Sequence, residues 1–228
     1  MGECKYCGRN GWLLPISPLG VCYNCHPMVL MEVSQKSRII IESEKIIQKS
    51  KNLDVQLSRC DLIVEYANAL IKYEKCNIET VKPRPSELVS KYTNEKEYII
   101  LKGLQTRVID DNQKVRVSQS PKSKINIYTK TLLKIMEYKG RMKNPSKLDV
   151  IESDVKMAIH QIQYVSYLED AQKAEFKKQR KKALDKYYEA LYFLQHDEIE
   201  DSLQHSYISF LESKIKELSG NENKTMED

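Results

Sequence analysis

Apolar residues recur at helical spacing between residues 28 and 80. Val33, Ile40 and Ile47 lie seven residues apart. A second run steps alternately by four and three residues, a spacing that keeps side chains on one face of an α-helix. The pattern predicts two long amphipathic helices with a short connection near Asn52, as an antiparallel hairpin over residues 28–80 or as one bent helix. The second run consists of Leu53, Leu57, Cys60, Val64, Ala67 and Ile71.

A linker, residues 77–86, follows the hairpin, because its prolines block a helix and favour extended chain before them. Ser86 is expected to start the next helix, and Thr93 is expected to cap a further one that reaches about Asp111. Residues 81–145 are therefore expected to form a helical middle segment.

Alternating apolar residues mark a region whose structure the pattern leaves open. Val115 and Val117 alternate, as do Ile125 and Ile127, on either side of a turn-rich stretch. This pattern fits a small β-hairpin or a loop between two helices. Beyond it, helix is expected over about 126–141.

The C-terminal part, residues 146–218, again carries an apolar stripe with steps of four and three. Further helices are expected over about 181–195 and 198–218. Gly220 ends the series, and residues 219–228 are expected to form a disordered polar tail.

Four cysteines within residues 1–27 form two pairs, each with two residues between its members. This gap lets two thiolates point at one ion, and Gly8 allows a tight turn after the first pair. Four sulfurs complete the tetrahedron of a structural zinc site and leave no position for catalytic water. A redox dithiol or an iron–sulfur site is the alternative, and His26 is a candidate replacement for one ligand. The expected ligands of one structural zinc ion are Cys4, Cys7, Cys22 and Cys25.

The second cysteine pair lies directly before the helix that Pro27 opens. Over residues 4–26 this arrangement resembles zinc ribbon and treble-clef fingers, in which the second ligand pair opens a helix. The resemblance implies metal binding, but it does not indicate which partner the finger binds. The head and first two helices also resemble an N-terminal zinc-and-helix region that precedes exonuclease domains in some bacterial proteins, although the acidic metal ligands of such an enzyme have no counterpart here.

Positive charge gathers between Lys122 and Lys147, here called the basic island, where Glu137 is the one acid. Such a segment predicts salt-dependent, sequence-independent binding to phosphates, or else a solvated face or a counterpart of the acidic C-terminal third. Lys130, Lys134 and Arg141 are expected to share one helix face, with the neighbouring apolar side chains towards the core. The candidate nucleic-acid-binding residues are Lys122, Lys124, Lys130, Lys134, Arg141 and Lys143.

Residues 167–195 resemble one helical hairpin of the tetratricopeptide (TPR) family. The resemblance implies that alanines let two helices approach closely, with the basic run 177–182 as the solvated turn between them. The match lacks the turn glycine and the closing proline, where Gln195 stands, and one unit is visible where solenoids need three or more. The residues that carry it are Tyr167, Ala171, Ala174, Ala183, Tyr187 and Ala190.

Composition narrows the functional classes. Of 228 residues, 41% are hydrophobic and 30% are charged, values typical of globular proteins. No apolar run approaches the roughly 20 residues that span a bilayer, and Met1 leads into the first cysteine pair without a signal peptide. A reducing, cytoplasmic location is therefore expected. The sequence has no phosphate-binding glycine-rich loop, His-Glu-x-x-His motif or nucleophile elbow, so no enzyme, catalytic residue or small-molecule substrate is predicted.

These observations predict a mainly α protein, in which a small four-cysteine zinc finger precedes a long-helix bundle with a TPR-like C-terminal hairpin. The function they favour is that of a zinc-stabilised helical adaptor or scaffold that binds a protein partner. The alternative is a nucleic-acid-binding accessory protein, associated with phage, defence or repair, that uses the basic segment 122–147. No membrane partner is expected.

Overall fold

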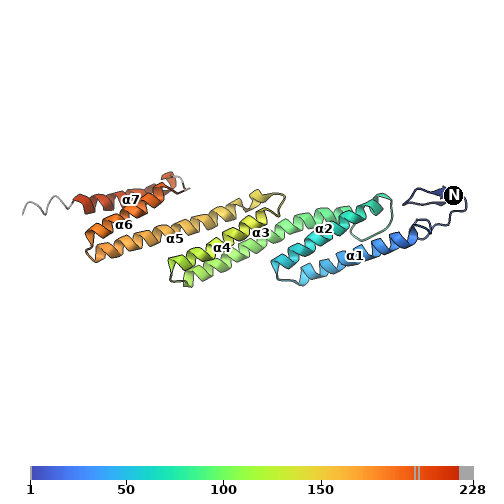
Figure 1. The fold of residues 1–228 in the computed structure, drawn as a ribbon, viewed down its shortest axis with the longest axis horizontal. Helices are drawn as coiled ribbons and strands as arrows, with labels where there is room; N and C mark the ends of the chain where they lie inside the picture. The colour runs from blue at the N-terminus through green and yellow to red at the C-terminus, as the bar shows by residue number, and fades with distance from the viewer. Residues whose placement is uncertain (1, 198, 200, 221–228) are drawn as a thin grey trace, which may run out of the picture. The chain divides into compact units, whose positions relative to one another are not determined.

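The computed structural model describes residues 2–197, 199 and 201–220, and most of them are helical (Figure 1). The predicted mainly α fold is confirmed. Strands β1 (Gly2–Glu3) and β2 (Asn10–Gly11) pair antiparallel near the N-terminus. The predicted tail covers residues 219–228. Residues 219 and 220 form the end of the last helix, and residues 221–228 lie outside the described residues. The helices are α1 (His26–Lys49), α2 (Leu53–Lys75), α3 (Pro85–Val117), α4 (Pro121–Lys139), α5 (Asp149–Phe176), α6 (Arg180–Gln195) and α7 (Asp201–Gly220), with a 3₁₀-helix at Pro145–Leu148.

The chain divides into two compact units. Unit 1 comprises Met1–Thr106 with Arg141–Asn144, and unit 2 comprises Arg107–Gly140 with Pro145–Asp228. Helix α3 therefore gives its first part to unit 1 and its last part to unit 2. None of the described helices combines the length and hydrophobicity needed to cross a membrane.

In unit 1, α1 and α2 form the predicted hairpin. Asn52 caps α2, because its side-chain oxygen accepts a hydrogen bond from the backbone N–H of Val55 at 3.2 Å. The Gln56 side chain donates to the carbonyls of Ile47 and Ser50, at 3.2 and 2.8 Å, so the last turn of α1 is also satisfied. The apolar side chains buried on these helices are Val29, Val33, Ile40, Leu57, Cys60, Ile63, Ala67 and Leu70.

The first part of α3 lies against both helices of this hairpin. Tyr92 donates a hydrogen bond to Glu44 of α1 at 2.7 Å. One turn later, Lys96 pairs with Asp61 of α2 at 2.5 Å. These contacts place the buried face of α3 on the hairpin, and they complete the core of unit 1 with Leu88, Ile99, Ile100 and Leu104.

Helix α3 is one unbroken helix, so the predicted cap at Thr93 is wrong. The Thr93 hydroxyl donates to the carbonyl of Val89 at 2.7 Å, a bond that Thr makes inside a continuous helix. The alternating segment that follows forms no hairpin. Instead, Val115 and Val117 belong to the end of α3, Ile125 and Ile127 belong to α4, and residues 118–120 are the loop between the two helices. Ser120 caps α4 by accepting a bond from the backbone N–H of Ser123 at 3.4 Å.

A buried carboxylate, Asp111, joins α3 to α4 in unit 2. It accepts hydrogen bonds from Thr131 of α4 and from Lys114, the latter at 2.9 Å. The Arg107 guanidinium donates to the Thr131 hydroxyl at 2.8 Å and lies 3.8 Å from Asp111. A buried carboxylate requires such partners, so this network fixes which side of α4 faces α3.

The buried side of α4 differs from the predicted one. The sequence places Leu132, Leu133, Ile135 and Met136 towards the core, but Leu133 and Met136 are 62% and 64% exposed. The buried side chains step by three and four residues and include polar groups that the hydrophobic pattern does not count. They are Tyr128, Thr131, Ile135 and Tyr138.

Helices α5, α6 and α7 form the C-terminal part of unit 2. Tyr187 of α6 is fully buried, and its hydroxyl donates to Glu175 at 2.6 Å. Lys214 of α7 reaches the same carboxylate at 3.2 Å, so Glu175 links all three helices. The small residues of the TPR resemblance lie in this core, but α5 is 28 residues long and a TPR unit is not confirmed. The buried small residues are Ala171, Ala174, Ala183 and Ala190.

The alanines of this core predict a sensitivity to added volume. Ala171→Leu should lower the free energy of unfolding by about 1–3 kcal/mol, because the site is fully buried and packed. Gln172→Leu adds a leucine at the next, exposed position of α5 and should change stability little. Urea unfolding followed by circular dichroism measures both. Equal stability of the two variants would contradict close packing of α5 on α6.

Candidate metal centre

The first cysteine pair lies in a tight turn between the two strands. The backbone N–H of Cys4 donates to the carbonyl of Arg9 at 2.8 Å, and that of Gly8 donates back to the carbonyl of Cys4 at 2.9 Å. Gly8 has a φ of 67°, a left-handed conformation that favours glycine. The turn therefore holds Cys4 and Cys7 on the same side of the loop, as two ligands of one ion require.

The second cysteine pair forms the start of α1. Backbone N–H groups of Cys25 and His26 both donate to the carbonyl of Cys22 at 2.9 Å, and Cys25 is the cap residue of α1. The N–H of Lys5 donates to the carbonyl of Gly20 at 3.0 Å, which ties the loop of the first pair to the chain before the second. Any ion held by both pairs would thus be joined directly to a long helix.

All four predicted cysteines come together. Their sulfur atoms lie within 4.8 Å of one another, and those of Cys7 and Cys22 are 3.9 Å apart. A zinc–sulfur distance of about 2.3 Å in a tetrahedron implies sulfur–sulfur distances of about 3.8 Å, so the cluster has the size of a metal site. Cys4 and Cys22 are buried, whereas Cys7 is exposed. His26 is not part of this cluster.

The electrostatics of the cluster favour a cation. Burial opposes ionisation of the Cys4 thiol, but backbone N–H groups of Cys22, Cys7 and Tyr6 outweigh it and lower its pKa from 9.0 to about 6. The Cys25 thiol behaves in the opposite way. Its hydrogen bond to Cys22, partial burial and the other sulfurs raise its pKa to about 12. Four thiolates repel one another at this distance, and a divalent cation at their centre removes that penalty. The donor set therefore fits a thiolate-bound metal ion.

The head is attached to the helical hairpin through the two side chains between Cys4 and Cys7. The Lys5 ammonium donates to the carbonyl of Asn77 at 2.9 Å, in the turn after α2. The Tyr6 ring stacks on the ring of Tyr73, with centroids 5.7 Å apart. Tyr73 is buried and donates a hydrogen bond to Glu32 of α1. No sequence pattern predicts this contact, because no periodicity relates residues so distant along the chain.

Two large apolar residues of the head point into solvent. Trp12 and Leu13 are 86% and 90% exposed, and they occupy the turn after β2. The turn is closed by a hydrogen bond of 3.3 Å from the backbone N–H of Leu14 to the carbonyl of Gly11. We call this pair the apolar tip. It contributes little buried surface to the described part of the chain, so packing does not explain its composition.

The predicted nucleic-acid-binding cations do not all lie on one helix. Arg141 lies beyond the end of α4, and it belongs to unit 1, where it pairs with Asp61 at 3.4 Å. Lys134 pairs with Glu137 at 2.8 Å. Lys122 and Lys143 are exposed, as is Lys130, and Lys124 is half-buried. The expected alignment of Lys130, Lys134 and Arg141 is thus wrong, and binding of phosphates by the six cations stays a prediction.

In comparisons with protein-family models, curated proteins and solved structures, nothing matches this chain. The resemblances to known fingers and to TPR hairpins therefore gain no support from homology. Function has to be argued from the side chains that the fold brings together.

Glu32 predicts how the stability of unit 1 depends on pH. The Tyr73 hydroxyl, followed by Lys72 and Lys36, lowers the pKa of the Glu32 carboxyl from 4.5 to about 2. A lowered carboxyl pKa gives stability that is complete above pH 4.5 and is lost as the pH falls towards 2. Because solvent screens part of this interaction, we expect Glu32→Gln to lower the free energy of unfolding by about 1–2 kcal/mol at pH 7.

The same variant should lose less stability than wild type between pH 4.5 and 2, and urea unfolding at a series of pH values tests this. Glu42→Gln is the matched control on α1, because Glu42 pairs with Arg38 on the exposed surface. It should leave both the stability and its pH profile almost unchanged. Parallel profiles for wild type and Glu32→Gln would refute the role of this carboxylate.

Proposed function

We propose that Cys4, Cys7, Cys22 and Cys25 bind one structural zinc ion. The observation that carries this proposal is the cluster of four sulfurs at the point where α1 begins. All four coordination positions would be filled by thiolates, so the ion would hold the chain together and leave no site for substrate. Its role would be to crosslink the two segments that carry the cysteine pairs, which have few buried apolar side chains, and to fix them at the start of α1.

We further propose that the protein is a zinc-stapled helical adaptor whose head docks a protein partner. The apolar tip supports this, because Trp12 is a residue type enriched at protein interfaces and is held on a turn beside the metal cluster. A rigid head lowers the entropy cost of presenting such an anchor. Nucleic-acid binding through the basic island is the weaker alternative, since Lys134 and Arg141 already pair with carboxylates.

Zinc binding predicts the metal content and the effect of removing a ligand. Purified protein should contain about one zinc ion per chain by elemental analysis, and Cys22→Ser should lose it. Cys76→Ser is the control, because this cysteine is half-buried and lies outside the cluster. It should retain the metal. Iron with visible absorbance, or no metal at all, would refute the zinc proposal.

Chelation should then unfold the head, because metal binding is folding free energy for a segment that cannot assemble its site alone. Most of the helical circular dichroism should survive, since both units bury apolar residues far from the cysteines. Loss of the whole helical signal would mean that the metal supports the entire structure and not the head.

The adaptor proposal predicts that partner binding depends on the apolar tip. Joint replacement of Trp12 and Leu13 by alanine should abolish capture of a specific protein that zinc-loaded wild type retains. The zinc content should not change, because both side chains are exposed. Phe176→Ala removes an equally exposed aromatic residue from the end of α5 and should retain the partner. Trp12, the chain's one tryptophan, should also shift its fluorescence on binding. Equal capture by all three proteins would refute docking through the tip.

A further inference from the structure

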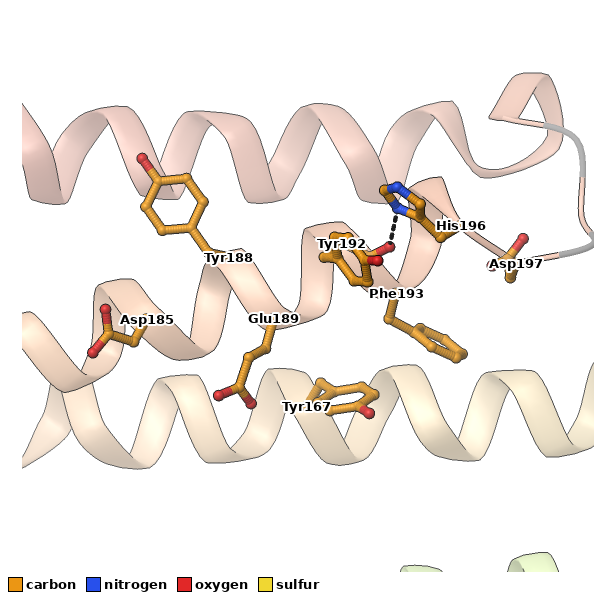
Figure 2. Close-up of a pocket in the computed structure, with 8 residues that line it drawn as sticks. All are labelled: Tyr167, Asp185, Tyr188, Glu189, Tyr192, Phe193, His196 and Asp197. Carbon is orange, nitrogen blue, oxygen red and sulfur yellow. Dashed lines mark hydrogen bonds between the residues drawn. The ribbon is translucent and has the colours of Figure 1, made fainter.

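An open groove of about 760 Å³ lies over the outer face of α6 in unit 2 (Figure 2). Its residues come from successive turns of α6, from Tyr167 of α5, and from the turn that follows α6. Among the described residues, no lysine or arginine lines it. We call it the α6 groove, and its lining residues are Tyr167, Asp185, Tyr188, Glu189, Tyr192, Phe193, His196 and Asp197.

The residues of the groove form a second stripe along α6, distinct from the stripe that is buried. The buried stripe runs through Ala183, Tyr187, Ala190 and Leu194, with steps of four, three and four residues. Asp185, Glu189, Tyr192 and His196 repeat the same steps two residues later and therefore lie on the opposite face. The outer face of a helix at the surface is normally charged and polar. Here it combines carboxylates with rings, and Tyr192 is 63% exposed.

The rings of the groove are held in place before any ligand binds. The His196 ring stacks on Tyr192 with centroids 3.9 Å apart, and its Nδ1 donates to the Tyr192 carbonyl at 2.9 Å (Figure 2). Phe193 packs between Tyr167 and His160, at centroid distances of 5.3 and 4.9 Å. These contacts hold the rings of Tyr192, Phe193 and His196 in place, so a ligand would meet ordered aromatic side chains.

The charge of the groove is negative, although the whole chain carries a net charge of +5. The Asp185 carboxylate is exposed and has no ion-pair partner among the described residues. The Glu189 side chain is 47% exposed. It forms an ion pair with Lys186 of the same helix, with the ammonium 2.5 Å from the carboxylate. Asp197 is mostly buried and already binds His160 at 2.6 Å. Asp185 is therefore the carboxylate of the groove that is most available to a ligand, and Glu189 would first have to release Lys186.

We propose that the α6 groove binds the lysine and arginine side chains of a basic segment presented by a partner protein. Aromatic faces attract cations through their quadrupole, and the attraction grows where water is partly excluded. A carboxylate in the same groove adds direct attraction between opposite charges. Tyr188 and the face of Tyr192 that His196 leaves uncovered supply the aromatic surface, and Asp185 supplies the charge, with Glu189 beside Lys186 as a second carboxylate. Phosphate groups would be repelled by the same carboxylates. The inference names the partner chemistry of the adaptor proposed above, and it uses a surface separate from the apolar tip.

The test uses full-length, zinc-loaded protein and a fluorescently labelled short peptide rich in arginine and lysine. Fluorescence anisotropy should show binding that weakens as salt rises. A matched peptide with glutamine at every basic position should not bind. Because the net positive charge of the protein opposes a basic peptide at long range, binding requires a local acidic site. Absence of binding at low salt would overturn the inference.

Variants of the groove locate the site. Tyr192→Ala should weaken peptide binding about tenfold, and Asp185→Asn by a similar factor, whereas Tyr192→Phe keeps the ring and should bind like wild type. Tyr98→Ala is the matched control, since Tyr98 is an exposed tyrosine of α3, outside the groove. Equal binding by Tyr98→Ala and Tyr192→Ala would overturn the assignment.

The outcome is separate from that of the adaptor proposal. Replacement of Trp12 and Leu13 should leave peptide binding unchanged, because the tip and the groove belong to different units. If the peptide fails to bind while capture through the tip persists, the groove inference falls and the adaptor proposal stands. If the peptide binds as expected while capture shows no dependence on the tip, docking through the head falls alone.

Discussion

Antiparallel packing of consecutive helices is the constraint on which the described structure depends. An isolated helix is marginal in water, so each must bury its apolar stripe on a neighbour. The connections at residues 50–52, 118–120 and 177–179 are short, and a short connection leaves an antiparallel neighbour as the partner for that stripe. Packing is therefore mostly local in sequence. This locality explains why each unit can keep a core of its own, with Leu57 and Ile63 in one and Tyr187 and Leu211 in the other.

The head cannot use this solution, because it has too few apolar residues to form a core. Val21 is fully buried, but the other buried side chains near it include two of the cysteines. Two-residue strands and hydrogen-bonded turns bring the sulfurs together without supplying much stability. A crosslink of thiolates through one ion would supply it. Stacking of Tyr6 on Tyr73 would then carry that stability into α2, since Tyr73 is buried among the residues of the hairpin.

Sequence patterns predicted the helices and the cysteine cluster, because both depend on local spacing. The long stripes of α1 and α2 and the two cysteine pairs appear in the structure where expected. The errors have a common cause: polar side chains whose hydrogen-bond partners the apolar pattern does not reveal. Thr93 signals a helix start in isolation, yet its hydroxyl bonds within α3. Thr131 is buried on α4 because its hydroxyl donates to Asp111 and accepts from Arg107. With Thr131 on the buried side of α4, Leu133 lies on the exposed side.

A count of charged residues also does not show which charges are paired within the fold and which are left to bind a partner. The basic island looks uniform in sequence, but Lys139 pairs with Asp149 at 2.6 Å and with Glu152, so it links α4 to α5. The C-terminal part looks uniformly acidic, but Glu175 is bound by Tyr187 and Lys214, whereas Asp185 points from the outer face of α6. A charge that already has a buried partner contributes little to a new ligand, because the existing contact must first be broken. The residues most able to recognise a partner are therefore those that folding does not use, and Asp185 and the exposed ring of Tyr192, both on the outer face of α6, meet that condition.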